Sequence, residues 1–137
     1  MIPKQTILLV EDDPVDAKTV RRALQELRVT NPLVHVENGE VALAWLRNPV
    51  NAPPGIILLD LNMPVMNGIE FLTVAKEDER FRRIPVVVLT TSNLEQDKLA
   101  SYDLSVAGYM IKPVDYLQFV EVVRSINLYW TLSQQPQ

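Results

Sequence analysis

Charged and hydroxyl side chains suited to phosphate chemistry directly follow short apolar runs of this chain. Glu11 and Asp12 follow the apolar run at residues 7–10, and Asp60 follows the run at residues 56–59. Two later runs are followed by a hydroxyl group and an ammonium group, at Thr90 and Lys112. Any chemistry proposed for the chain has to give a role to the three carboxylates, the hydroxyl group and the ammonium group together.

Three carboxylates that share one cleft repel each other unless a cation joins them. Mg²⁺ suits such a cleft because it takes hard oxygen ligands and keeps several of its waters. An aspartate can also attack phosphorus and form an aspartyl-phosphate, a transfer that needs mainly alignment and charge neutralisation. We therefore predict Mg²⁺ held by Glu11, Asp12 and Asp60, with Asp60 as the phosphoacceptor. Lys112 would neutralise the other side of the phosphoryl group, and Thr90 would hydrogen-bond one of its oxygens.

Taken singly, these residues also have structural explanations. Asp13 is better explained as a helix cap than as a metal ligand. Thr90 alone fits an ordinary β-branched strand residue, and Lys112 alone fits a solvated lysine. Asp60 is different, because a buried run ends there on a charge without a cationic neighbour in the sequence. The combination favours a functional site.

The elements that would position these residues alternate between strands and helices. Three of the apolar runs are continuous, which is typical of strands buried on both faces of a parallel sheet. Stretches of helical period separate the runs and predict an α/β doubly wound fold. In such a sheet, ligands bind beyond the carboxyl ends of the strands. The expected strands lie at residues 7–10, 33–36, 56–59, 86–89 and 107–111.

The helix starts carry recognisable signals. Asp13 can cap the first helix, Pro14 suits its first position, and Asp16 favours the positive end of the helix dipole. Asn38 and Gly39 open a second helix, and the proline-rich stretch 48–55 is a loop. Three more helices are expected at about residues 67–78, 93–103 and 115–131.

Size and composition indicate one domain over residues 1–137, with a core at about 6–131 and a polar tail at 133–137 that frays. The absence of cysteine excludes disulfides and thiolate sites. A net charge of −4 disfavours nucleic acid as a direct partner. No run approaches a membrane span or a signal peptide, so we expect a cytoplasmic protein without membrane contact.

The chain resembles the receiver domain of two-component response regulators over residues 6–126. The resemblance rests on Ile7-Leu-Leu-Val-Glu-Asp-Asp-Pro14, Leu58-Leu-Asp-Leu-Asn-Met-Pro-Val-Met-Asn-Gly68, Val88-Leu-Thr-Thr91 and Lys112-Pro113. It implies a flavodoxin-like, CheY-like fold: a five-stranded parallel sheet in the order 2-1-3-4-5, with helices on both faces.

The same resemblance implies roles for individual residues. Asp60 corresponds to the phosphoacceptor, Glu11 and Asp12 to the metal-binding acids, and the backbone carbonyl of Asn62 to a further ligand of Mg²⁺. A histidine kinase is the implied phosphodonor.

Further implied roles concern switching. Thr90 and Lys112 match the switch hydroxyl and the phosphate-contacting lysine, and Tyr109 matches an aromatic that swings inward, although a partly buried strand aromatic would look the same. The Lys112–Pro113 bond is expected to be cis. Thr91 stands where a smaller residue is more usual, which would narrow access of a phosphodonor.

A narrower resemblance links the chain to cyanobacterial phytochrome-linked response regulators, which are stand-alone receivers. It rests on Arg83-Ile-Pro-Val-Val-Val-Leu-Thr-Thr-Ser92, Ala100-Ser-Tyr102 and Leu128-Tyr-Trp130. It implies a light-sensing histidine kinase as partner. Because no output domain is expected after about residue 131, the signal should leave by protein contact or by onward phosphotransfer.

The last expected helix is more apolar than a one-sided surface helix requires, which favours a protein contact. We predict a homodimer through the fourth helix, fifth strand and fifth helix, a face that receivers commonly use. Scattered surface hydrophobic residues are the alternative. The candidate dimer face comprises Tyr102, Leu117, Val122, Leu128 and Tyr129.

Two other functions stay open at this point. An aspartate-nucleophile phosphatase commonly needs an acidic residue two positions after the nucleophile, where this chain has Asn62. A structural receiver that dimerises without being phosphorylated is the other alternative, and the complete set of site residues disfavours it.

Overall fold

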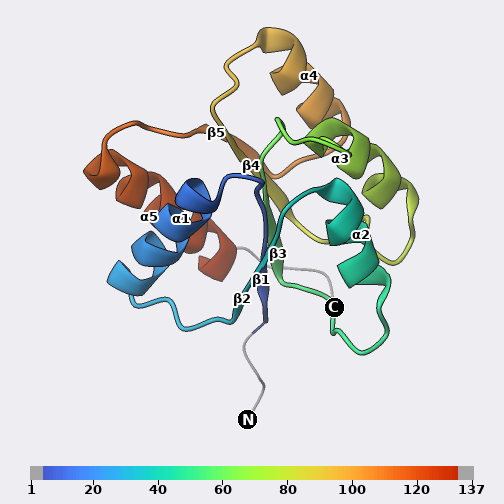
Figure 1. The fold of residues 1–137 in the computed structure, drawn as a ribbon, viewed down its shortest axis with the longest axis horizontal. Helices are drawn as coiled ribbons and strands as arrows, with labels where there is room; N and C mark the ends of the chain where they lie inside the picture. The colour runs from blue at the N-terminus through green and yellow to red at the C-terminus, as the bar shows by residue number, and fades with distance from the viewer. Residues whose placement is uncertain (1–4, 133–137) are drawn as a thin grey trace.

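The computed structural model of the chain describes residues 5–132, which form one five-stranded parallel sheet covered by helices on both faces (Figure 1). The strand order is β2-β1-β3-β4-β5, so the predicted doubly wound fold is confirmed. Strands and helices alternate along the chain as β1 (Ile7–Val10), α1 (Pro14–Glu26), β2 (Leu33–Val36), α2 (Gly39–Arg47), β3 (Ile56–Leu59), α3 (Gly68–Glu77), β4 (Val86–Thr90), α4 (Glu95–Asp103), β5 (Gly108–Ile111) and α5 (Tyr116–Leu132).

The sheet separates two hydrophobic cores. Leu8 and Val10 of β1 face the core formed with α2 and α3, whereas Ile7 and Leu9 face the core formed with α1 and α5. Successive side chains of a strand point to opposite faces, so a strand with a core on each side has to be apolar at every position. Figure 1 shows α1 and α5 on one side of the sheet and α2 and α3 on the other.

The register of the sheet brings the chemical groups to one edge. Val10 of β1 lies beside Leu59 of β3, and Thr90 of β4 lies beside Ile111 of β5. The residues that follow these strands therefore leave the sheet at the same, carboxyl-terminal edge. This is the edge at which the sequence predicts a ligand site.

Side chains fix the starts of three helices, and the predicted cap of the first helix is confirmed. Asp13 caps α1 and accepts hydrogen bonds from the backbone N–H groups of Val15 at 2.8 Å and Asp16 at 3.4 Å. Asn38 caps α2, and Asn67 begins α3 with a capping box.

Helix α4 begins at Glu95, later than the sequence predicts, and its N-cap Leu94 offers no side-chain hydrogen bond. The hydroxyl of Ser92 instead donates to Asp97 Oδ2 in the first turn, at 2.6 Å. The tail at 133–137 lies outside the residues that the structure describes.

Candidate functional site

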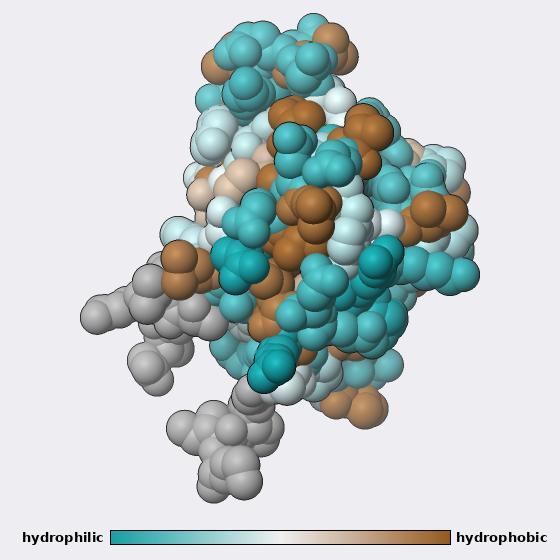
Figure 2. Space-filling view, turned by 90° about the vertical axis from the view of Figure 1, so that its left-hand side faces the viewer, coloured by the Kyte–Doolittle hydropathy of each residue, from teal (hydrophilic) through white to brown (hydrophobic). Residues whose placement is uncertain are grey.

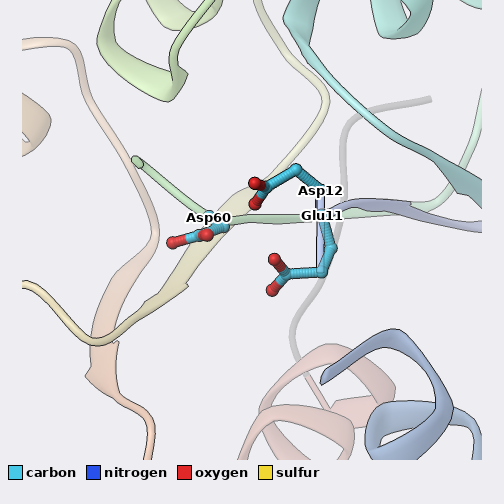
Figure 3. A group of neighbouring side chains, drawn as sticks. All are labelled: Glu11, Asp12 and Asp60. Carbon is cyan, nitrogen blue, oxygen red and sulfur yellow. The ribbon is translucent and has the colours of Figure 1, made fainter. Parts of the chain in front are cut away.

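Three carboxylates meet at the carboxyl-terminal edge of the sheet, as predicted. One oxygen from each of Glu11, Asp12 and Asp60 lies within 4.8 Å of the others. Figure 3 shows the carboxylates of Glu11 and Asp12, at the end of β1, directed to the side on which Asp60 extends from the end of β3. Glu11 and Asp60 are buried, with exposed fractions of 1% and 6%, whereas Asp12 is exposed. The site therefore has an open side at Asp12.

Close packing of the backbone holds the segment that follows β3 in place. Gly68 begins α3 directly against the segment that follows β3, and its backbone N–H donates to the carbonyl of Leu61 at 3.0 Å. A Cβ at residue 68 would lie 2.6 Å from the carbonyl oxygen of Asp60 and 2.8 Å from Leu61 Cα. Glycine is required there because the backbone of Asp60 and Leu61 approaches too closely for any side chain.

The ammonium group of Lys112 reaches into the carboxylate cluster from the loop that follows β5. It donates a hydrogen bond to Glu11 Oε1 and another to Asp16 Oδ2, at 2.8 Å, and it lies 3.8 Å from Asp60 Oδ2. The Lys112 side chain is only 6% exposed. A buried ammonium group needs paired charges, and here carboxylates from three separate segments supply them.

The contact between Lys112 and Asp16 was not predicted. The sequence indicates only that Asp16 lies in the first turn of a helix, where a carboxylate is stabilised by the helix dipole. The sequence does hint that Asp16 lies near Glu11, because the predicted cap Asp13 fixes the first turn of the helix directly after Glu11. The partner lies 96 residues away, however, so the contact itself emerges only from the fold.

Burial sets the protonation tendencies of Glu11 and Lys112. Burial raises the pKa of Glu11 from 4.5 to about 8, and the negative charge of Asp60 adds to this effect, although the hydrogen bond from Lys112 opposes it. For Lys112, burial by itself would lower the pKa, but the hydrogen bonds to Asp16 and Glu11 prevail and raise it. Lys112 is therefore charged at neutral pH, and a cation near Glu11 would favour its ionised form.

The predicted switch residues belong to one hydrogen-bonded chain. The backbone N–H of Ser92 donates to Thr90 Oγ1 at 3.2 Å, and the Tyr109 hydroxyl donates to the carbonyl of Ser92 at 2.8 Å. Thr90 is fully buried, whereas Tyr109 is half-buried against the core on the α3 side. Ser92 thereby links the end of β4 to Tyr109 of β5 and to the first turn of α4, a role that its sequence position does not reveal.

Residues 7–124 match the response regulator receiver domain family. The chain belongs to the response regulator receiver family. Response regulator Rcp1 of Synechocystis sp. is 39% identical over 132 residues, which cover 93% of this chain and 90% of Rcp1. Among solved structures, the phosphorylated cyanobacterial phytochrome response regulator RcpA superposes with a TM-score of 0.90 at 39% identity, over 98% of this chain and 99% of RcpA. The Mn²⁺-bound form of Rcp1 superposes with a TM-score of 0.89 at 36% identity, over 97% and 99% of the two chains.

One expectation from the family resemblance is wrong in this receiver. The Lys112–Pro113 bond is trans, as is every other peptide bond between residues 5 and 132. Trans is the intrinsically favoured isomer even before proline, by about 0.5–1 kcal/mol. With this isomer the Lys112 ammonium group bonds to Glu11 and Asp16 and lies 3.8 Å from Asp60 Oδ2.

Asn62 and Thr91 lie at the margins of the site. Asn62 is exposed, and its backbone N–H approaches Asp60 Oδ1 at 3.5 Å. Thr91 is also exposed, and it lines an open cleft of about 440 Å³ between the start of α1 and the start of α5. Thr91 therefore lies in the wall of this solvent-exposed cleft and not inside the carboxylate cluster.

The candidate dimer face is largely exposed. The side chains of Tyr102, Leu117, Leu128 and Tyr129 are exposed, whereas Val122 is half-buried and packs against the core between α1 and α5. Val122 thus offers less exposed apolar surface to a partner than we expected from the sequence. Figure 2 shows apolar and polar surface interleaved on the side of the molecule formed by α1 and α5. No helix within residues 5–132 is long and apolar enough to cross a membrane.

Proposed function

We propose that this receiver accepts a phosphoryl group on the carboxylate of Asp60 from a histidine kinase, in a reaction assisted by Mg²⁺. The observation that carries the proposal is the joint placement of Glu11, Asp12 and Asp60 within 4.8 Å, with the Lys112 ammonium 3.8 Å from Asp60 Oδ2. This placement combines a nucleophile, a set of metal ligands and a fixed positive charge in one site.

The donor set of the site fits Mg²⁺. Carboxylate oxygens are hard ligands of the kind that Mg²⁺ prefers, and three converge here on one space. The raised pKa of buried Glu11 reflects the cost of its charge, which a divalent cation would offset. Glu11, Asp12 and Asp60 would hold the ion together with the backbone carbonyl of Asn62. Bound there, Mg²⁺ would neutralise charge on the phosphoryl oxygens during transfer.

The residues of the chain then have separate tasks. A carboxylate oxygen of Asp60 forms the new bond to phosphorus, while the bond from phosphorus to the imidazole nitrogen of the phosphohistidine breaks. Lys112 balances the negative charge that the phosphoryl group brings. Thr90 is fully buried at the end of β4, next to β3, and its hydroxyl donates a hydrogen bond to a phosphoryl oxygen. Movement of Thr90 toward the phosphoryl group lengthens the bond that it accepts from the Ser92 N–H, and this biases the packing of Tyr109 between two states.

The partner we propose is a phytochrome-type histidine kinase. The support is the likeness to the phytochrome response regulator RcpA and to Rcp1, with which this chain shares nearly its whole length. The output is protein contact through a homodimer, with Tyr102, Leu117, Leu128 and Tyr129 on the α4–β5–α5 face. A cytoplasmic location and the absence of direct contact with nucleic acid complete the proposal, the latter because of the net charge of −4.

Acetyl phosphate provides the direct test. The chain is incubated with acetyl phosphate, with and without Mg²⁺, and its intact mass is measured beside an Asp60→Asn variant. We expect a Mg²⁺-dependent gain of one phosphoryl group that is absent in the variant. Persistent label on Asp60→Asn would move the acceptor elsewhere, and no gain in the folded wild type would refute the proposal. Steady release of phosphate from simple phosphate monoesters would instead support a phosphatase.

A further inference from the structure

The Lys112 ammonium group is shared among three carboxylates, and two of the three are needed elsewhere. An ammonium group has three N–H donors. Lys112 directs one donor to Glu11 and one to Asp16, while Asp60 lies slightly beyond hydrogen-bond distance, at 3.8 Å. In the proposed function Glu11 turns to the metal ion and Asp60 becomes the phosphoryl carrier. Asp16 is the one partner of Lys112 with no other task in the site.

The backbone that carries Asp16 is fixed. Asp16 is the third residue of α1, and the side chain of its cap, Asp13, accepts hydrogen bonds from the N–H groups of Val15 and Asp16. The backbone N–H of Asp13 in turn donates to Glu11 Oε2 at 3.1 Å. The first turn of α1 is thereby tied to the end of β1. A carboxylate on so fixed a turn can hold a lysine at a defined place.

The bond from Lys112 to Asp16 is of the strong kind. At 2.8 Å between an ammonium and a carboxylate, it is charge-assisted. Lys112 is 6% exposed, whereas the Asp16 side chain is 34% exposed and thus forms the outer end of the pair. Asp16 thus anchors a buried ammonium group from the solvent-facing end of the pair.

We propose that Asp16 is a positioning residue for phosphotransfer, which anchors Lys112 beside Asp60 once Glu11 has turned to the metal ion. This inference rests on the proposed function. Asp16 itself touches neither the acceptor nor the phosphoryl group, so its whole effect passes through Lys112.

The test is a double-mutant cycle on the phosphorylation rate. The rate of mass gain is measured at saturating acetyl phosphate and Mg²⁺ for wild type, Asp16→Ala, Lys112→Ala and the double variant. We expect Asp16→Ala to slow phosphorylation about tenfold, the loss expected for one charge-assisted hydrogen bond. In the Lys112→Ala background, with longer incubation, the same change should alter the rate less than about twofold.

Two further variants separate positioning from general effects. Asp16→Asn keeps an oxygen that can accept from Lys112, so its rate should lie between those of wild type and Asp16→Ala. Glu26→Ala removes one negative charge from the exposed far end of the same helix and should leave the rate unchanged. Calorimetric titration with Mg²⁺ alone should show a dissociation constant within about threefold of wild type for Asp16→Ala, because Asp16 is not a metal ligand.

The outcomes are distinct. An unchanged rate in folded Asp16→Ala, or an equal loss with and without Lys112, would overturn the positioning role while the proposed function stands. A loss explained wholly by weaker Mg²⁺ binding would overturn it as well. A wild-type chain that gains no phosphoryl group would refute the proposed function, and this inference with it.

Discussion

Replacing Gly68 with alanine should destabilise the fold and displace Asp60, the proposed phosphoacceptor, at the same time. The added Cβ would lie 2.6 Å from the carbonyl oxygen of Asp60 and 2.8 Å from Leu61 Cα. Both obstacles are backbone atoms, so no side-chain rotation relieves the clash. The start of α3 or the end of β3 has to move instead.

The size of the effect follows from the two opposing contributions. Overpacking costs about 1–3 kcal/mol in well-packed sites, and backbone obstacles place Gly68→Ala in the upper half of that range. Alanine is favoured over glycine inside a helix by about 1 kcal/mol, but this gain is smaller at the first position of α3. The net loss in unfolding free energy should be about 2 kcal/mol.

Gly108 provides the matched control. A Cβ at residue 108 would approach nothing closer than Val87 Cγ1, at 3.8 Å, which is an ordinary contact. Gly108→Ala should therefore change the unfolding free energy by less than about 0.5 kcal/mol. Urea denaturation followed by tryptophan fluorescence gives both values, and the acetyl phosphate assay should show slower phosphorylation for Gly68→Ala alone. Equal stabilities of the two variants would refute the reasoning from close backbone approach.

Two further predictions concern strain and charge. Val65 has a φ of 68° and is 74% exposed, so Val65→Asn should raise the unfolding free energy by about 0.5–1 kcal/mol, because asparagine tolerates the left-handed region better than a β-branched residue. Val50→Asn, at an exposed valine without a positive φ, is the control, and an equal gain there would contradict the argument. The raised pKa of Glu11 gives a second prediction, for the metal-free protein in the presence of a chelator. Between pH 4.5 and about 8 the folded state binds more protons than the unfolded state, so the unfolding free energy should fall as the pH rises through this range. Urea denaturation at a series of pH values gives the unfolding free energy as a function of pH, and Glu11→Gln should flatten this curve in that range. Parallel curves for the variant and the wild type would show that Glu11 is not the group responsible.

The sequence reveals those features of this receiver that depend on local patterns. Continuous apolar runs predict β1 and β3 because a strand covered on both faces cannot alternate with polar residues. Asp13 and Asn38 predict helix starts because a cap is a contact between near neighbours. The carboxylate cluster was predictable since parallel strands of one sheet deliver their last residues to one edge.

Features that depend on long-range contacts were not predictable in this way. The strand order came from the family resemblance, and the bond between Lys112 and Asp16 joins residues whose proximity only the folded sheet creates. Helix α4 begins later than predicted, and the bond from the Ser92 hydroxyl to the side chain of Asp97 in its first turn is also not evident from the sequence. The isomer of the Lys112–Pro113 bond was carried over from relatives and is wrong for this chain.

In the proposed switch, the two bonds made by the backbone of Ser92 limit how strongly phosphorylation of Asp60 can act through this route. The Ser92 N–H donates to Thr90 and the Ser92 carbonyl accepts from Tyr109, so one residue joins the buried hydroxyl to the half-buried ring. Neutral hydrogen bonds contribute about 0.5–1.5 kcal/mol each, so exchanging both shifts an equilibrium by about 1–3 kcal/mol, or about 5- to 150-fold. Coupling of that size cannot produce an all-or-none device. A fraction of unmodified molecules would already sample the signalling arrangement, and basal output would be a built-in property of the receiver.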